Sequence, residues 1–193
     1  MNDVRTVKAV VVYESFFGNT ESIARAIASG LRLEHLAAEA VDVADVADLA
    51  DLDPSAYDLL VVGGPTHAFA LSRPSTRGDA VARGGDDRYS RQGLREWLGG
   101  LPRCTGPSLA ASFDTRVSKV RHLPMSAARS AARLLREHGY TVVAGPTGFV
   151  VRDVEGPLEQ SEMERAIAWA RALGREIQGR VQADTELHRR PCS

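Results

Sequence analysis

The chain has 193 residues, a length that fits one domain of ordinary size, or one domain with an insertion and a tail. Hydrophobic residues make up 44% of it, which is enough for a packed core and excludes a largely disordered chain. The 24 Lys and Arg residues nearly balance the 25 Asp and Glu residues, and the formal net charge is -1. This balance argues against a general nucleic-acid binder, and it gives no acidic excess that would attract a basic redox partner.

The two cysteines predict neither a disulfide framework nor a metal site. Cys104 and Cys192 lie far apart, and neither has a second Cys or a His at ligand spacing. The first residues lack the apolar core of a secretory signal, and no apolar run reaches the roughly 20 residues of a membrane span. We therefore expect a cytoplasmic protein without a membrane span and without a nucleic-acid partner. The sequence leaves the oligomeric state open.

Strand-like apolar runs alternate with helix-like segments along the chain. The predicted strands cover residues 7–13, about 38–43, 57–62, about 108–113 and 140–144, with an edge piece at 148–151. The predicted helices cover a stripe from Ile23 to Leu31, a short segment around Trp97, residues 125–138, and a last segment from Ser161 to Ile177. This alternation predicts an α/β fold, a doubly wound three-layer αβα sandwich around a five-stranded parallel sheet.

The domain is expected to cover residues 5–178, with a polar insertion at about 72–93 and a flexible C-terminal tail at 179–193. The insertion holds five arginines, three aspartates and four glycines and shows no apolar period. It is either a solvated mixed-charge loop or an element that binds an anionic partner such as a nicotinamide dinucleotide phosphate through its arginines.

The sharpest functional signal is the loop YESFFGNT at residues 13–20. A strand ends at Tyr13 and a helix begins near Asn19 or Thr20, so unpaired N–H groups at the helix N-terminus can hold a phosphate. Gly18 allows a close approach of the backbone, and Ser15 adds a hydroxyl beside the polar side chains of Asn19 and Thr20. The alternative is that these polar side chains only cap the helix.

The phosphate loop contains no basic residue. No Lys or Arg occurs between residues 9 and 24, whereas a P-loop needs a Lys after its glycines. A dinucleotide fingerprint needs three spaced glycines, and Gly18 is the only one here. Backbone and neutral side chains must therefore bind the phosphate.

The order Val12-Tyr13-x-Ser15-x-x-Gly18-x-Thr20, followed by Ala24 and Ile27, resembles the FMN-phosphate signature of the flavodoxin family. The resemblance implies a sheet of order 2-1-3-4-5 and FMN as the cofactor. Phe16 and Phe17 replace the hydroxyl residues of electron-carrier flavodoxins. In this the chain looks more like the flavodoxin modules of flavoprotein oxygen reductases and actinobacterial flavodoxin-like proteins. Each aromatic ring either shields the flavin or packs against neighbouring loops.

A second loop, Gly63-Gly64-Pro65-Thr66-His67-Ala68-Phe69, resembles the second flavin loop of this family. The resemblance implies that the five residues from Pro65 to Phe69, namely Pro65, Thr66, His67, Ala68 and Phe69, lie near the ring. His67 either donates to the flavin or is an exposed loop residue without a role. Phe69 either stacks on the ring or belongs to the core or a lid.

A third loop at the pyrimidine end of the flavin is expected to contain Ser112, Phe113, Asp114 and Thr115. Asp114 and Arg116 can instead pair with each other or with the insertion. No loop shows the Trp and Tyr pair that encloses the ring in many electron-transfer flavodoxins.

Three functions are compatible with these features. The leading hypothesis is an FMN-binding redox protein that carries electrons one or two at a time to a partner protein. The second is an NAD(P)H:quinone-type oxidoreductase that uses FMN on small molecules. The third is an interaction protein that keeps the fold and has lost the flavin. No catalytic residue and no metal ligand is predicted.

Overall fold

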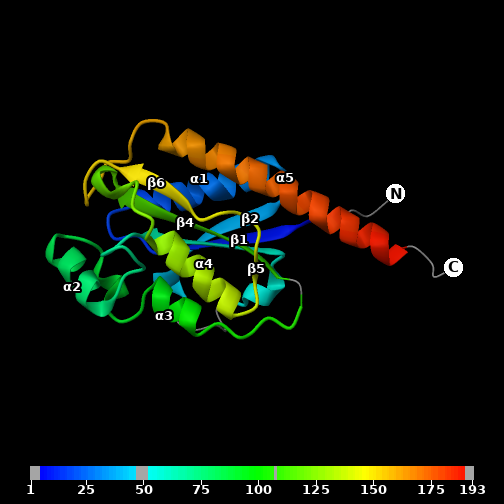
Figure 1. Ribbon diagram of the computed structural model, residues 1–193, viewed down its shortest axis with the longest axis horizontal. Coiled ribbons are helices and arrows are strands. Elements are labelled where there is room, and N and C mark those ends of the chain that lie inside the picture. The colour runs from blue at the N-terminus through cyan, green and yellow to red at the C-terminus, as the bar shows by residue number, and fades with distance from the viewer. Residues whose placement is uncertain (1–4, 47–51, 107, 190–193) are drawn as a thin grey trace.

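The computed structural model describes residues 5–46, 52–106 and 108–189 and shows an α/β sandwich around one parallel sheet (Figure 1). The sheet has the order β2-β1-β3-β4-β5, and a sixth strand, β6, pairs with β4. Its strands are β1 (Lys8–Tyr13), β2 (Ala37–Asp42), β3 (Leu59–Pro65), β4 (Leu109–Val117), β5 (Thr141–Val142) and β6 (Thr147–Val151). The predicted fold class and strand order are confirmed.

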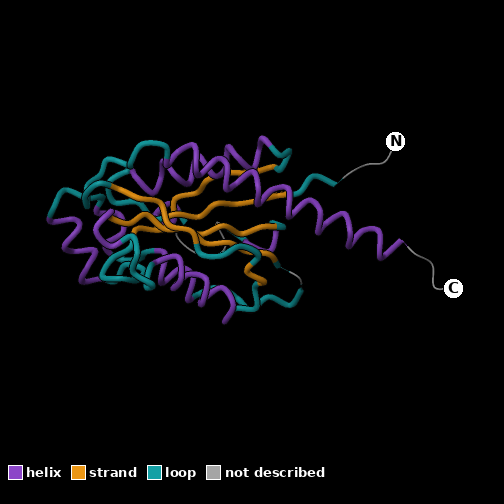
Figure 2. Tube along the Cα trace, turned by 45° about the horizontal axis from the view of Figure 1, so that its top comes forward, coloured by secondary structure: helices purple, strands orange, loops and turns teal. Residues whose placement is uncertain are grey.

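Helices cover both faces of the sheet (Figure 2). On one face lie α1 (Asn19–Leu33) and α5 (Glu162–Arg189), and on the other lie α2 (Pro74–Ala82), α3 (Leu94–Gly99) and α4 (Ala127–Glu137). Short 3-10 turns complete the chain at η1 (Val43–Asp45), η2 (Pro54–Ala56), η3 (Asp87–Ser90) and η4 (Ser118–Val120). Among the described residues, no helix combines the length and the apolar character needed to cross a membrane.

The central strands are apolar throughout because both of their faces are buried. In β1, Ala9 and Val11 pack in the cluster beneath α1 and α5, while Val10 and Val12 pack in the cluster beneath α3 and α4. The continuous apolar run that predicted this strand therefore reflects its central position in the sheet.

Two short strands, β5 and β6, occupy the sheet position next to β4, as the Gly145-Pro146 interruption predicted. β5 pairs with the beginning of β4 at Leu109 and Ala110, and β6 pairs with β4 from Phe113 to Val117. The predicted end of β4 at residue 113 is wrong. The strand continues to Val117 because β3 and β6 flank its second half. The expected third flavin loop, 112–115, is therefore strand, and the loop after β4 begins with η4.

The segment 72–93 is folded and is not a solvated loop. It contains α2 and η3, and it buries the side chains of Arg77 and Tyr89 completely. Arg77 pairs with Glu96 at 3.0 Å, and the Tyr89 hydroxyl lies 2.8 Å from Asp42. The missing apolar period concealed this structure because buried polar groups anchor it.

The predicted flexible tail begins as helix. From residue 179, α5 continues to Arg189 and extends past the end of the sheet (Figure 1). Residues such as Gln, Glu, Arg and Ala have good helix propensity, and Arg180 pairs with Glu176 one turn earlier at 2.8 Å. The rest of the predicted tail, 190–193, lies outside the described residues.

Candidate functional site

The loop between β1 and α1 leaves a row of backbone donors open. Gly18 is the N-cap of α1 and adopts φ 79°, a left-handed conformation that glycine tolerates best. No side chain caps the helix from this position. Within the described part of the chain, nothing accepts a hydrogen bond from the N–H groups of residues 16–20. Such a row at the start of a 15-residue helix is a binding site for an anion.

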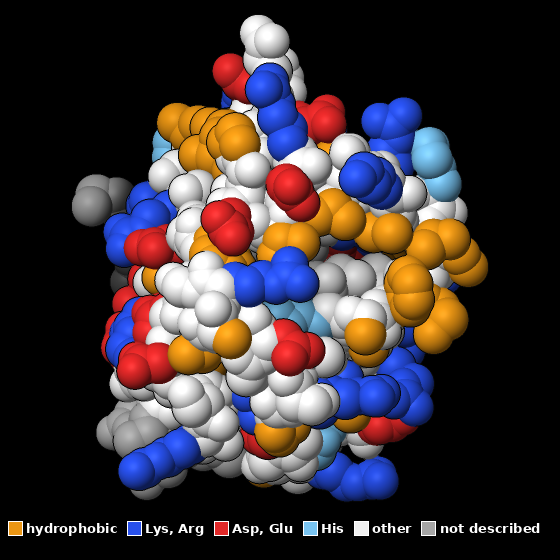
Figure 3. Space-filling model, turned by 90° about the vertical axis from the view of Figure 1, so that its left-hand side faces the viewer, with side chains coloured by type: hydrophobic (Ala, Val, Ile, Leu, Met, Phe, Trp, Pro, Cys, Tyr) orange, Lys and Arg blue, Asp and Glu red, His pale blue; other side chains and the backbone are white. Residues whose placement is uncertain are grey.

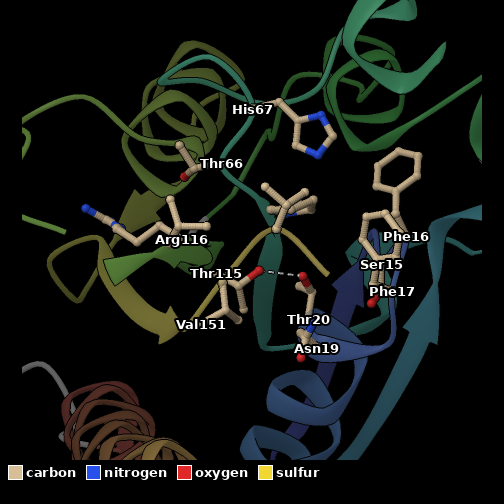
Figure 4. Close-up of a pocket in the computed structure, with 13 residues that line it drawn as sticks. Ser15, Phe16, Phe17, Asn19, Thr20, Thr66, His67, Thr115, Arg116 and Val151 are labelled. Carbon is tan, nitrogen blue, oxygen red and sulfur yellow. Dashed lines mark hydrogen bonds between the residues drawn. The ribbon is translucent and has the colours of Figure 1, made fainter. Parts of the chain in front are cut away.

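The polar side chains of this loop are held by specific partners. The Ser15 Oγ accepts from the Glu21 N–H at 3.1 Å, so Ser15 caps the first turn in part. The hydroxyls of Thr20 and Thr115 lie 2.7 Å apart, as the dashed line in Figure 4 marks. Because only one of the two donates within this pair, one hydroxyl hydrogen stays available to a ligand. Asn19 instead donates to the Glu155 carbonyl at 3.0 Å and ties α1 to the loop after β6.

A cavity of about 120 Å³ lies beside this loop at the carboxyl ends of the strands. Figure 4 shows the ends of β1, β3 and β4 around it. Nine predicted site residues line it: Ser15, Phe16, Phe17, Asn19, Thr20, Pro65, Thr66, His67 and Thr115. Four lining residues were not predicted as site residues: Arg116, Val117, Val151 and Val154. Arg116 and Val117 lie on the part of β4 beyond its predicted end. Val151 and Val154 lie at the end of β6 and in the loop after it, a strand that the sequence predicted only as an edge piece.

Three predicted site residues serve the core. Ser112 Oγ donates to the Ala128 carbonyl at 2.9 Å, and the ring of Phe113 is fully buried. Asp114, also fully buried, accepts from the Ala128 N–H at 3.1 Å and from Arg116 at 2.6 Å. Ser112 and Asp114 attach α4 to β4, Phe113 packs in the core beneath α1 and α5, and none of the three lines the cavity. The alternative that Asp114 pairs with Arg116 is confirmed.

Three further predicted residues lie beside the cavity and do not line it. Gly18 contributes backbone to the phosphate loop. Ala68 and Phe69 form the tip of a turn closed by the reciprocal hydrogen bonds of His67 and Ala70, with φ values of 45° and 65°. Phe69 is 44% exposed, so its ring is available at the surface.

The two phenylalanines of the loop have different environments. Phe16 is buried, and its ring lies 5.1 Å from that of His67 and 4.9 Å from that of Tyr89. Phe16 thus packs against neighbouring loops. Phe17 is half-buried at the cavity wall. Gly63 lies under the ring of Phe113, where a Cβ would come within 2.1 Å of a ring carbon, so this glycine serves core packing.

His67 lines the cavity beside the phosphate loop. Burial lowers its pKa from the ordinary value of 6.5, the Thr76 backbone acts in the opposite direction, and the charge of Arg77 lowers it further. The imidazole is therefore neutral near pH 7, with one N–H donor, which the Thr76 backbone engages, and one acceptor.

Glu14 is a buried carboxyl group that sequence analysis missed. It has no exposed surface and accepts from the Leu94 N–H at 2.8 Å. Burial raises its pKa, whereas hydrogen bonds from Ser72 and Leu94 and the Arg77 charge act in the opposite direction. A charged residue directly after the apolar run of β1 was the available signal. Its contacts connect the phosphate loop with the segment 72–98.

Exposed apolar side chains lie on the loops that follow the strands beside the cavity. Six large hydrophobic side chains are exposed among the described residues. Four of them lie in segments that follow the carboxyl ends of strands: Phe69, Leu123, Met125 and Val154. Figure 3 shows hydrophobic side chains gathered along one side of this face. Such a group marks a surface for a ligand or a partner. Across the described residues, no group of three or more His, Cys, Asp or Glu residues could hold a metal ion.

Solved structures resemble this arrangement over nearly the whole chain. Flavodoxin 2 from Bacillus cereus has 20% sequence identity, covers 88% of this chain and 99% of its own, and superposes with a TM-score of 0.63. The chain has a flavodoxin-like fold. A short-chain flavodoxin associated with a bacterial microcompartment, with 18% identity over 89% of this chain and 99% of its own, also gives 0.63.

A flavodoxin, WrbA-like protein from Agrobacterium tumefaciens gives a TM-score of 0.56 at 18% identity, over 90% of this chain and 99% of its own. At such identities the likeness concerns the fold alone. No family model and no curated protein matches the sequence.

Proposed function

We propose that this chain binds FMN at the carboxyl ends of its strands and carries electrons one or two at a time. The observation that supports this proposal best is the row of open N–H groups at residues 16–20 beside a cavity whose lining arginine, Arg116, is already paired with Asp114. A dianionic phosphate on a neutral ligand suits such a site, because backbone dipoles can bind it without a basic side chain.

The phosphate end of FMN fits the residues present. The N–H groups of Phe16–Thr20 would hold the phosphate oxygens, and the free hydroxyl hydrogen of the Thr20–Thr115 pair would add a donor. The Ser15 N–H is already donated to the Tyr89 hydroxyl at 3.0 Å, so Ser15 contributes its hydroxyl hydrogen only.

The isoalloxazine ring requires more room than the cavity alone provides. The cavity holds about 120 Å³, whereas sites for small organic ligands usually have ~300 Å³ or more. We place the ring at the open mouth, between the turn at 67–70 and the loop after β4, against Phe69. When bound, FMN supplies one- and two-electron chemistry, and the chain holds it, orients it and limits the access of water.

Reconstitution with FMN tests this proposal. The purified chain should take up FMN with micromolar affinity or better, measured by quenching of flavin fluorescence and by the visible spectrum of the complex after gel filtration. Photoreduction of the complex under anaerobic conditions should then show both reduced states. A protein that emerges without flavin absorbance and shows no micromolar binding contradicts the proposal.

One observation favours an interaction protein without flavin, namely the small cavity volume. The melting temperature with and without FMN distinguishes the flavin-free protein from the FMN protein, because a ligand that binds the native state must stabilise it. A rise in melting temperature with FMN removes the flavin-free alternative, and an unchanged temperature at millimolar FMN supports it.

The oxidoreductase alternative was motivated by the missing acidic face and by the arginines of the insertion, and two of these arginines have partners inside the protein. Arg77 pairs with Glu96, and Arg88 pairs with Asp42, Asp45 and Asp86. We therefore rank NAD(P)H:quinone chemistry below electron transfer to a protein. Oxidation of NADPH with benzoquinone no faster than that given by free FMN would remove it. The cytoplasm remains the expected compartment.

A further inference from the structure

The segment that leaves the cavity wall after β4 carries only positive charge. From Thr115 to Arg136, 22 residues include five Arg and one Lys and no Asp or Glu. The chain as a whole has a formal charge of -1, so this positive charge is a local feature and not the result of a basic composition.

Most of these cations project into solvent. Arg116 is the exception, since it is nearly buried and bound to Asp114 at 2.6 Å. Lys119, Arg121 and Arg129 are exposed, and in the described part of the chain no acidic side chain pairs with them. Arg133 has one distant partner, Glu137 at 3.8 Å, and keeps 69% of its side chain exposed.

Two arginines from the neighbouring segment adjoin α4. Arg95 on α3 donates to the carbonyls of Leu71 and Ser72 at 2.6 and 2.9 Å, which fixes its position beside the start of α2. Burial and then the charges of Arg73 and Arg133 lower the pKa of Arg95, so these three cations are neighbours. We call the six residues Arg73, Arg95, Lys119, Arg121, Arg129 and Arg133 the basic face.

Apolar side chains accompany the basic face. Leu123 and Met125 lie between Arg121 and Arg129 in the chain and are 42% and 62% exposed. Figure 3 shows hydrophobic side chains with Lys and Arg above and below them on this side of the molecule. An apolar centre within a charged surround is the usual anatomy of a transient protein interface.

The basic face does not have the form of a site for a small anion. The first N–H groups of α4 are already used: Ala127 donates to Thr66 at 3.0 Å, Ala128 to Asp114 at 3.1 Å and Arg129 to Ser126 at 3.3 Å. The cations are spread along α4 and the adjoining loop and do not converge on one point. A large, acidic surface can contact them together.

We propose that the basic face docks an acidic protein redox partner, with Leu123 and Met125 at the centre of the contact. The role of the contact in electron exchange rests on the proposed function, because it brings the partner to the mouth of the flavin cavity. Docking itself needs only the charges and the apolar side chains, so it is measurable with or without FMN.

Binding of an acidic [2Fe–2S] ferredoxin tests the proposal. Calorimetry or surface plasmon resonance should show binding at about 20 mM salt and a weakening of about tenfold or more at about 300 mM, as screening of charge pairs requires. The variant R129E/R133E should weaken binding at low salt about tenfold or more, and L123S/M125S should weaken it at both salt concentrations.

The matched control is R25E/R180E. It changes the net charge by the same amount as R129E/R133E, but on α1 and α5, which cover the opposite face of the sheet. It should leave the affinity within about threefold of the parent chain, and melting curves should show that all variants are folded.

Three outcomes would overturn the proposal. Equal losses of affinity in both charge variants would show that net charge alone causes the effect, and would overturn it. So would the absence of ferredoxin binding at low salt, or tighter binding of duplex DNA or phosphatidylserine vesicles through the same arginines. A ferredoxin complex formed by a chain that takes up no FMN would separate this proposal from the proposed function.

Discussion

The phosphate loop at 13–20 and the segment 72–98 meet at the end of β1 and use polar groups in opposite ways. The loop leaves the N–H groups of residues 16–20 without acceptors in the described protein. The neighbouring segment buries Arg77 and Tyr89, and the Arg77 Nη1 and the Tyr89 hydroxyl have partners within the protein, Glu96 and Asp42. Donors that are left open indicate a ligand, whereas buried groups that are paired indicate a structural role.

Two adjacent residues connect these regions. Glu14 accepts from the Leu94 N–H and lies close to Arg77, while the Ser15 N–H donates to the Tyr89 hydroxyl. The segment 72–98 therefore supports the loop from behind, and the ligand side of the loop stays free. The predictions that follow separate the supporting role from the binding role.

The largest effect is expected from Arg77→Ala. This change removes the cation that pairs with Glu96 and acts on the buried carboxyl group of Glu14. The Glu96 side chain is 36% exposed, so the loss of stability comes from the cavity that a fully buried side chain leaves and from the missing cation beside Glu14. The free energy of unfolding should fall by about 3–5 kcal/mol in urea denaturation. Arg83→Ala, at an exposed position of the same segment, should stay within about 0.5 kcal/mol of the parent chain. A loss for Arg77→Ala that is no larger than for Arg83→Ala would show that the segment does not depend on this buried charge.

A smaller loss of stability is expected from Tyr89→Phe. The ring remains, but the Ser15 N–H and the carboxylate of Asp42 each lose a partner inside the protein. The free energy of unfolding should fall by about 1–3 kcal/mol, the cost of buried polar groups without partners. An unchanged value would mean that water replaces the hydroxyl and that the two regions are less tightly coupled than the structure indicates.

Thr20→Val should affect binding more than folding. It removes the hydroxyl that lies in the phosphate loop itself and leaves only that of Thr115 on β4, which also loses the partner that orients it. The dissociation constant for FMN should rise about tenfold, which corresponds to about 1.4 kcal/mol for one hydrogen bond to a charged group. Ser29→Ala, farther along α1, is the control and should leave the affinity unchanged. Equal affinities of the parent chain and Thr20→Val would remove the threonine pair from the proposed phosphate site.

The smallest effect concerns pH. Burial holds the pKa of His67 below 6.5, so the folded state takes up this proton less readily than the unfolded state. The contribution of the neutral His67 side chain to the stability of the folded state is complete above about pH 6.5 and is lost as pH falls through the pKa of the folded state. The stability difference between the parent chain and His67→Gln should therefore shift in favour of the variant between about pH 7 and about pH 5. A difference that is independent of pH would mean that His67 titrates normally.

The sequence predicted the features that depend on local pattern. The apolar run of β1, the glycine at the start of α1 and the neutral loop between them were recognisable because neighbouring residues determine them. Nine cavity residues followed from the ends of β1, β3 and β4. The rest depends on contacts between distant parts of the chain.

The errors have a common physical cause, because a polar residue looks like a loop residue until its partner is known. Asp114 and Arg116 seemed to end β4, yet they pair inside the sheet and allow the strand to continue to Val117. Arg77 and Tyr89 concealed a folded segment in the same way. Residues 179–189 resembled a frayed end, because a polar composition also suits a helix that extends past the sheet.

A comparison of FMN with riboflavin tests the central claim most directly. The two ligands share the ring and the ribityl chain and differ in the phosphate alone, which the open N–H groups of residues 16–20 are expected to bind. Fluorescence titration of the parent chain should give an affinity for FMN about 100-fold higher than for riboflavin, since only FMN can accept several charge-assisted hydrogen bonds from these groups. Equal affinities, or no binding of either flavin, would contradict the account.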